Sequence, residues 1–316
     1  MDLLLEEQLP DMEALEKARR IANTYINQIA IGYGFWIHKT ENGKPLGFGT
    51  DENDQCKVRK WKNIVSLSAG YAHVLGLDSS GKAFATGFDP DNRCKMGGWK
   101  DLQAISAGWT HSLGLKKDGT VLAKGHPSDG QLKVESWKNI IQVCGGNFYS
   151  LGLQRDGRVL ATGANYDGQC NVEHWTDVTF LYSGGFHTLG LRKDGTALAT
   201  GLNDCGQCDI ENWDGLVSLC GGRNFTLGLR KDGTVLATGS DQDGRCRVGH
   251  WKNIVMIASG QDHSVALRMD GTVLATGYNE DGRCNVSHWH NVAAVYAAFD
   301  HTVGLCKDGT LLVAGP

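Results

Sequence analysis

The sequence has no uninterrupted apolar stretch long enough to cross a membrane, since no run approaches the roughly 18 residues that a spanning helix needs. Its first residues lack the basic start, apolar centre and small-residue exit of a secretory signal. Its net charge of −4 offers no basic surplus for a nucleic-acid backbone. We therefore expect a cytoplasmic chain that does not span a membrane, and we do not expect a nucleic-acid binder.

Glycine is abundant instead, with 43 residues, and much of it recurs at a fixed interval of 38 residues. A fixed period of about 20–50 residues indicates a repeat architecture. The glycines at this interval are Gly49, Gly87, Gly125, Gly163, Gly201, Gly239, Gly277 and Gly315. The tryptophans at the same interval are Trp61, Trp99, Trp137, Trp175, Trp213, Trp251 and Trp289.

One copy, beginning at Trp251, shows what a repeat contains. Asn253–Gly260 is a short apolar run, and His263–Arg268 alternates with the period of two that is typical of a strand. An Asp-Gly turn leads to a third strand at Thr272–Gly277, and a second turn leads to a short fourth strand at Arg283–Val286. Four strands without a helix predict one blade of a β-propeller, so the fold class is all-β.

A bare position recurs in the middle of the second strand of nearly every copy, and we expect another backbone to approach it closely near the axis. The residues there are Gly76, Gly114, Gly152, Gly190, Gly228 and Gly304.

The number of copies leaves two ring sizes open. Ile29–Gly49 is an imperfect first copy, and the last copy, Trp289–Pro316, stops after its third strand. The first three strands therefore occur eight times and the fourth occurs seven times, which favours eight blades. The missing outer strand could come from Leu3–Glu6, and seven blades with an accessory hairpin is the alternative.

Residues 1–28 form an N-terminal extension outside the repeat, and residues 29–316 form a single propeller domain. Asp11 follows a proline and is placed to cap a helix that runs to about Asn27. We expect the helix to cover an edge of the ring, the alternative being a partner-binding helix. Its apolar stripe is Leu15, Ala18, Ile21, Ala22 and Tyr25.

The phrases AGWTHSLGLKKDGTVLAKG at Ala107–Gly125 and TGANYDGQC at Thr162–Cys170 resemble the regulator-of-chromosome-condensation repeat. The resemblance extends from about Ile29 to Pro316, and it implies a β-propeller, normally of seven blades. The short repeat is more similar to bacterial members and to propeller-type β-lactamase inhibitor proteins, which bind through aromatic loops of one face. The eukaryotic namesake is a nucleotide exchange factor that acts through an inserted segment. Because every spacing from Gly49 to Gly315 is 38 residues, we do not expect that activity here.

Several residue patterns invite a metal or redox interpretation, and for each we prefer a structural one. His73, His111, His187, His263 and His301 share one repeat position with Phe35, Tyr149 and Phe225, which favours buried histidines that bond to the backbone. Cys205 and Cys208 form an isolated pair in a variable turn. Six of the ten cysteines share one packed position, too far apart to bridge, which favours a reducing cytoplasm. We expect no metal and no cofactor.

The informative positions are those that break the repeat. Two variable residues join the first and second strands of each copy, on the same face as turns that carry acidic side chains such as Asp51, Asp89 and Asp241. Exposed aromatic residues flanked by charge are typical of a protein-binding surface, although some of these rings could simply fill the channel. The partner-binding residues that we expect at the channel mouth are Tyr33, Tyr71, Trp109, Phe148, Phe186, Arg223, Asp262 and Phe299.

The opposite face carries the Asp-Gly turns with a rim of Lys and Arg such as Lys116, Arg155 and Arg230. We expect most of these charged side chains to be solvated on exposed turns. The sequence shows no nucleophile–base pair, so the first hypothesis is a non-enzymatic, monomeric propeller that binds another protein. The alternatives are a small-molecule or glycan binder or lyase that uses the axial pocket, and phosphate or nucleic-acid contact through the basic rim.

Overall fold

The computed structural model describes residues 11–316, which form one helix and 24 strands. The strands build eight antiparallel sheets of three strands each, and every sheet comes from one continuous segment. The helix is α1 (Met12–Thr24). The strands are β1 (Ile29–Ile31), β2 (Phe35–Lys39), β3 (Pro45–Gly49), β4 (Ile64–Ala69), β5 (His73–Asp78), β6 (Ala83–Gly87), β7 (Leu102–Ala107), β8 (His111–Lys116), β9 (Val121–Gly125), β10 (Ile140–Gly145), β11 (Tyr149–Gln154), β12 (Val159–Gly163), β13 (Val178–Ser183), β14 (His187–Arg192), β15 (Ala197–Gly201), β16 (Leu216–Gly221), β17 (Phe225–Arg230), β18 (Val235–Gly239), β19 (Ile254–Ser259), β20 (His263–Arg268), β21 (Val273–Gly277), β22 (Val292–Ala298), β23 (His301–Cys306) and β24 (Leu311–Ala314).

The sheet of β19, β20 and β21 shows why each copy folds as it does. Its three strands coincide closely with the three alternating or β-branched runs of the sequence. Asp270 fixes the turn between β20 and β21, because its Oδ1 accepts hydrogen bonds from Thr272 N at 2.9 Å and Thr272 Oγ1 at 2.6 Å. Gly271 supplies the left-handed φ of 85° that the turn requires.

The prediction of a fourth strand in each copy is wrong. The segment Arg283–Val286 runs as a series of turns and pairs with no strand. Its backbone is satisfied locally instead, since Asn279 Oδ1 accepts from Cys284 N at 2.8 Å and Val286 N donates to the Cys284 carbonyl at 2.8 Å. The segment Leu3–Glu6, proposed as a closing strand, lies outside the described residues.

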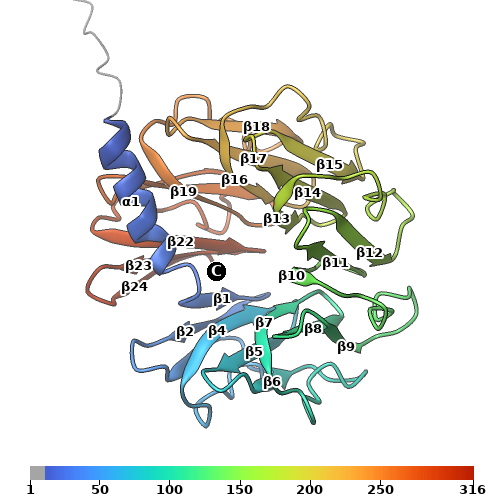
Figure 1. Cartoon of the computed structure of the whole chain (residues 1–316). Helices are drawn as coiled ribbons and strands as arrows, with labels where there is room; N and C mark the ends of the chain where they lie inside the picture. The colour runs from blue at the N-terminus through green and yellow to red at the C-terminus, as the bar shows by residue number, and fades with distance from the viewer. Residues whose placement is uncertain (1–10) are drawn as a thin grey trace, which may run out of the picture.

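The sheets follow one another around a ring in the order of the chain, as the colours in Figure 1 show. The first strand of each sheet is innermost, since β1, β10, β13, β16, β19 and β22 line one common cavity. The ring closes where the last sheet meets the first: β1 contacts β22, and the rings of Trp36 and His301 lie 5.4 Å apart. Even the imperfect first copy therefore forms a complete three-stranded sheet.

Neighbouring sheets are joined by a buried hydrogen bond that repeats around the ring. His73 Nε2 lies 3.1 Å from the hydroxyl of Ser112, which is 39 residues further along the chain, and that hydroxyl donates to the Arg93 carbonyl at 2.8 Å. The serine therefore accepts from Nε2–H, and the histidine is neutral with its lone pair on Nδ1. For four of the five histidines the expected bond to the backbone is wrong, because the partner is a hydroxyl of the next sheet; His301 does contact a backbone carbonyl, that of Pro316. The equivalent pairs are His111–Ser150, His187–Thr226 and His263–Thr302.

The copies that lack this histidine show compensating changes. Phe35 faces the copy that has Val74 in place of the hydroxyl, and both side chains are fully buried in one cluster. Tyr149 reaches across with its own hydroxyl, which donates to the His187 carbonyl at 2.8 Å. These substitutions preserve contact between adjacent sheets by packing or by a different hydrogen bond.

The bare position of the second strand has a different cause from the one expected. A Cβ at Gly114 would lie 2.9 Å from the Cε3 and Cζ3 atoms of Trp99, so the repeat tryptophan, not another backbone, covers this glycine. The same relation holds at Gly76, Gly152, Gly190, Gly228 and Gly304. The tryptophans also join adjacent sheets, since Trp61 packs in one cluster with Phe35 and Ile37 of the preceding sheet.

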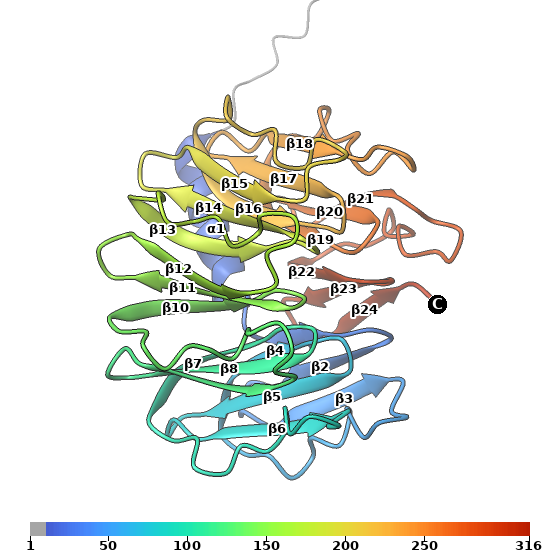
Figure 2. The same cartoon turned by 90° about the vertical axis from the view of Figure 1, so that its right-hand side faces the viewer.

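Helix α1 packs against β19 and β22 and begins where the sequence predicts, with Asp11 Oδ1 accepting from Glu13 N and Ala14 N. Leu15 and Ala22 are buried, whereas Ile21 of the expected stripe is 47% exposed. Arg19 is buried instead and donates to the carbonyls of Lys231 and Arg230, at 2.7 Å each. Figure 2 shows α1 and the C-terminus on opposite faces of the ring. No helix in residues 11–316 has the length and apolar character needed to cross a bilayer.

Replacing Gly114 with alanine tests the tryptophan–glycine contact. The added Cβ forces Trp99 to move, so we expect Gly114→Ala to lower the free energy of unfolding by about 1–3 kcal/mol. Urea denaturation followed by tryptophan fluorescence measures the effect. Gly249→Ala is the matched control, because Gly249 is exposed and a Cβ there meets no atom within 4 Å. Equal midpoints for the two variants would contradict the contact.

The buried histidines predict a loss of stability in acid. Burial lowers the pKa of His263 from 6.5 to about 3, so between these values the unfolded chain binds more protons than the folded one. The free energy of unfolding should therefore fall as the pH drops through this window. We expect His263→Phe, which copies the natural Phe225, to reduce the slope in denaturation series between pH 7 and pH 4. An unchanged slope would refute the assignment of a neutral buried imidazole.

Candidate functional site

The candidate site is built from the loops that join the first and second strands of each sheet, which we call the mouth loops. They comprise residues 32–34, 70–72, 108–110, 146–148, 184–186, 222–224, 260–262 and 299–300. Backbone hydrogen bonds tie several of them to the next loop around the ring. Trp109 N donates to the Gly146 carbonyl at 3.1 Å, and Arg223 N donates to the Gln261 carbonyl at 3.1 Å. These bonds hold the side chains of the mouth loops in a fixed arrangement.

Five aromatic side chains of the mouth loops form one continuous cluster. Tyr33 stacks on Tyr71 at 5.0 Å between ring centroids, and Tyr71 meets Trp109 at 5.3 Å. Trp109 then stacks on Phe148 at 5.6 Å, and Phe299 closes the cluster against Tyr33 at 5.7 Å and Tyr71 at 5.6 Å. Distances of this size are those of favourable aromatic pairs. The cluster is only partly buried, and Tyr33 is 48% exposed.

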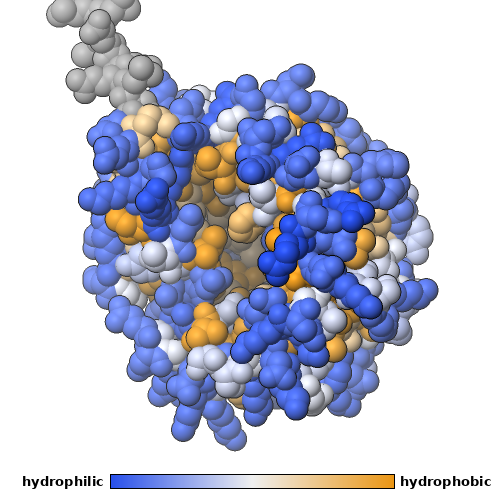
Figure 3. Space-filling view, in the orientation of Figure 1, coloured by the Kyte–Doolittle hydropathy of each residue, from blue (hydrophilic) through white to orange (hydrophobic). Residues whose placement is uncertain are grey.

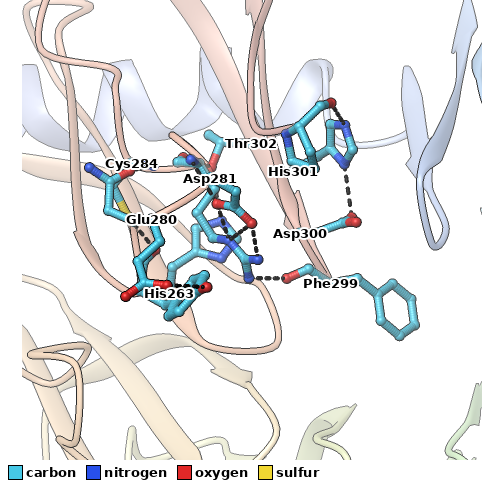
Figure 4. Close-up of polar contacts among 12 residues, drawn as sticks. His263, Glu280, Asp281, Cys284, Phe299, Asp300, His301 and Thr302 are labelled. Atoms are coloured by element: carbon cyan, nitrogen blue, oxygen red, sulfur yellow. Dashed lines mark hydrogen bonds and ion pairs between the residues drawn. The ribbon is translucent and has the colours of Figure 1, made fainter.

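Phe299 reaches this cluster because the last mouth loop has an unusual backbone. In other copies a glycine precedes the loop, and a Cβ at Gly260 would lie 2.1 Å from the Cε1 atom of His263. Ala298 supplies such a Cβ, and His301 makes different contacts, with Asp300 at 2.8 Å and with the Pro316 carbonyl at 3.0 Å. Phe299 adopts a φ of 44°, a conformation that costs an aromatic residue free energy. In Figure 4 its ring points away from Asp281 and His301.

A cavity of about 290 Å³ opens beside the aromatic cluster. Trp109, Phe186 and Phe299 supply aromatic surface to it, and Arg223 supplies a guanidinium group. The remaining lining is mostly small or polar, including the paired glycines of two mouth loops. The glycines leave this part of the mouth open, because the loops there carry little side-chain volume.

Several acidic groups of the mouth are engaged by partners that the sequence analysis missed. Arg245 is buried and donates to both Asp262 and Asp243, and Arg93 is buried and donates to Asp91 at 2.6 Å. Asp300 is held by His301, which keeps the pKa of Asp300 below its ordinary value although burial raises it. The signal in the sequence was the replacement of Gln by Arg, in three copies, at the position before the repeat cysteine: Arg93, Arg245 and Arg283.

Arg93 and Arg283 also brace the mouth loops directly. Arg93 donates to the Trp109 carbonyl at 3.3 Å, and Arg283 donates to the Phe299 carbonyl at 3.0 Å. Each guanidinium group therefore links an outer turn to a mouth loop that carries an aromatic residue. Such side chains position the aromatic cluster without belonging to it.

The structure brings most of the eight expected residues to one end of the ring. Tyr33, Tyr71, Trp109, Phe148 and Phe299 form the aromatic cluster, whereas Phe186 and Arg223 line the cavity. Asp262 is the exception in chemical character, because its carboxylate is bound by Arg245. Asn147 and Gln261 also line the cavity and were not singled out.

A second cavity, which we call the axial channel, lies between the innermost strands and measures about 440 Å³. It shares Ser183, Gly221, Ser259 and Ala298 with the mouth cavity, so the two are continuous. Figure 3, viewed from the α1 side, shows a central hollow with apolar side chains around it.

Some of the Lys and Arg side chains of the basic rim on this side form ion pairs, for example Lys116 with Asp118 at 3.3 Å.

The repeat histidines and cysteines are held in structural contacts. Within residues 11–316, no group of three or more His, Cys, Asp or Glu side chains is placed to hold a metal ion. The repeat cysteines donate to backbone carbonyls, as Cys56 Sγ does to the Phe48 carbonyl at 3.3 Å. Burial raises the pKa of Cys56 to about 11 and that of Cys94 to about 12, so these thiols remain protonated and unreactive near neutral pH.

Comparison with solved structures shows the same fold at low sequence identity. The ectodomain of the receptor kinase CR4 from Physcomitrella patens is 20% identical with a TM-score of 0.61, and the alignment covers 80% of this chain and 73% of that chain. The ectodomain of the receptor kinase ACR4 from Arabidopsis thaliana is 16% identical with a TM-score of 0.60, covering 91% and 94%. Prp20p from Saccharomyces cerevisiae is 18% identical with a TM-score of 0.58, covering 80% and 82%.

Sequence comparison gives the family. The comparison with curated proteins found no match. The profile of the regulator of chromosome condensation (RCC1) repeat matches five segments, at residues 103–131, 140–169, 178–207, 216–245 and 254–283. Each segment begins within the first strand of a sheet and ends in the turns after its third strand. With propeller proteins such as Prp20p among its structural neighbours, the chain belongs to the regulator of chromosome condensation repeat family.

Proposed function

We propose that this protein is a non-enzymatic propeller that binds another protein through the mouth loops. The observation that carries the proposal is the continuous cluster of Tyr33, Tyr71, Trp109, Phe148 and Phe299, with centroid distances of 5.0–5.7 Å. Partly exposed aromatic side chains of this kind are the usual anchors of protein interfaces. A related protein, Prp20p, is described with binding properties to Gsp1p and histones, which supports a binding role for the fold.

The rigidity of the mouth loops supports this function. Ordering loops and side chains upon association costs free energy, and here the backbone hydrogen bonds and the buried arginines have already ordered them. The aromatic surface lies at the centre of the face, and charged turns surround it. This is the arrangement of an interface with an apolar core and a polar rim.

The wider proposal concerns the whole chain. We propose a single, monomeric eight-bladed propeller over residues 29–316, with the N-terminal extension docked on it through α1. We also propose a reducing cytoplasmic location, because the protonated thiols recur at one packed position and none needs a partner sulfur. Phosphate contact through the basic rim is less well supported, since aspartates of the same turns, such as Asp118, stand beside the cations.

Truncation of the aromatic cluster tests the proposed function. We expect the double variant Tyr71→Ala/Trp109→Ala to weaken binding to a partner captured from the native lysate by at least about tenfold, as loss of interface anchors does. The measurement is affinity capture followed by titration of the identified partner against both proteins.

The matched control is Phe180→Ala. Phe180 is 54% exposed in β13, and it lines neither the mouth cavity nor the axial channel. Equal loss of the partner in this variant, or full retention in the double variant, would show that binding occurs elsewhere.

A further inference from the structure

The axial channel is lined mostly by apolar and uncharged polar side chains. Residues from six of the eight sheets and Ile26 surround it, and none of them is charged at neutral pH. Its apolar surface includes Ile29, Ile31, Met256 and Ala258. A cavity of this composition gains its binding free energy from apolar contact and from the release of water.

Three polar side chains of the channel lining bond to protein partners. Tyr296 donates its hydroxyl proton to the Tyr25 carbonyl, and Ser183 Oγ donates to the Gly145 carbonyl at 3.3 Å. Cys144 Sγ donates to Ser183 Oγ at 3.3 Å, and burial raises the pKa of Cys220 to about 12. The side chains of Tyr296, Ser183 and Cys144 are therefore bonded within the protein, and the apolar side chains are the main contact that the lining offers to an occupant.

The mouth end of the same cavity carries one uncompensated charge. Arg223 lines the mouth cavity, is exposed, and makes no side-chain hydrogen bond or ion pair with any residue in 11–316. The carboxylates of the neighbouring mouth loops are occupied, Asp262 by Arg245 and Asp300 by His301. An anion at the mouth would thus meet a guanidinium group that no carboxylate engages.

We propose that the mouth and the axial channel together bind an amphiphilic carboxylate, with the head group on Arg223 and the aliphatic chain in the channel. A guanidinium group matches a carboxylate by two parallel hydrogen bonds. The two continuous cavities, of about 290 and about 440 Å³, are of the size that encloses a small molecule. The inner strands are mostly six residues long, so the channel wall extends roughly 20 Å, enough for a medium-length chain.

Isothermal titration calorimetry with decanoate and decan-1-ol, both below their aggregation limits, tests the site. We expect decanoate to bind the wild-type protein saturably at one site per chain. Arg223→Gln should weaken decanoate binding about tenfold while leaving decan-1-ol unchanged, because only the charged hydrogen bonds are lost. Arg247→Gln is the matched control, since Arg247 is an exposed arginine that pairs with Asp241 in an outer turn.

A second variant examines the channel itself. Ala258→Phe places a phenyl group in the channel lining and should abolish binding of both ligands. Its urea denaturation midpoint shows whether the propeller still folds. The proposal is overturned if decanoate does not bind the wild-type protein, if Arg223→Gln binds it as tightly, or if folded Ala258→Phe binds both ligands unchanged. None of these measurements involves a protein partner, so their failure is separate from failure of the proposed function.

Discussion

The structure depends on the fact that each sheet buries its faces mainly against the sheets before and after it. The cluster around Trp61 joins Phe35 and Ile37 of one sheet to Ile64 and Leu67 of the next, and similar clusters recur along the ring. A single three-stranded sheet could not retain such a core in water. The first and last sheets must therefore also find each other, which they do through Trp36 and His301.

Closure of the ring and formation of the aromatic cluster have a common origin. Ala298 stands where other copies have glycine, and its Cβ occupies the space into which the repeat histidine would turn. His301 is consequently held by Asp300 and the C-terminal carbonyl, and Phe299 takes a left-handed backbone and meets Tyr33 and Tyr71 across the seam. The most irregular copy is thus the one that completes both the ring and its mouth.

Several charges of the mouth are held in ion pairs. Buried arginines hold the aspartates of the outer turns and one aspartate of the mouth, and they also fix the carbonyls of Trp109 and Phe299. Removing such a buried partner would leave an unpaired charge, which is far more costly than the pair is favourable. What remains exposed at the centre is aromatic surface and the single cation of Arg223, and this is the chemistry that any ligand of the mouth meets.

The sequence by itself determined the repeat, the three strands of each copy and the face on which the variable residues lie, because period, strand alternation and turn chemistry are local properties. It placed Trp109 and Phe186 on the same face for that reason, and both line the mouth cavity. It could not show that Trp99 and its equivalents cover the repeat glycine, or that Arg245 binds the Asp262 carboxylate. Nor could it show that the segment expected as a fourth strand forms turns whose backbone groups bond to one another. Those outcomes depend on which side chains meet across sheets 38 or more residues apart, and only the tertiary structure decides them.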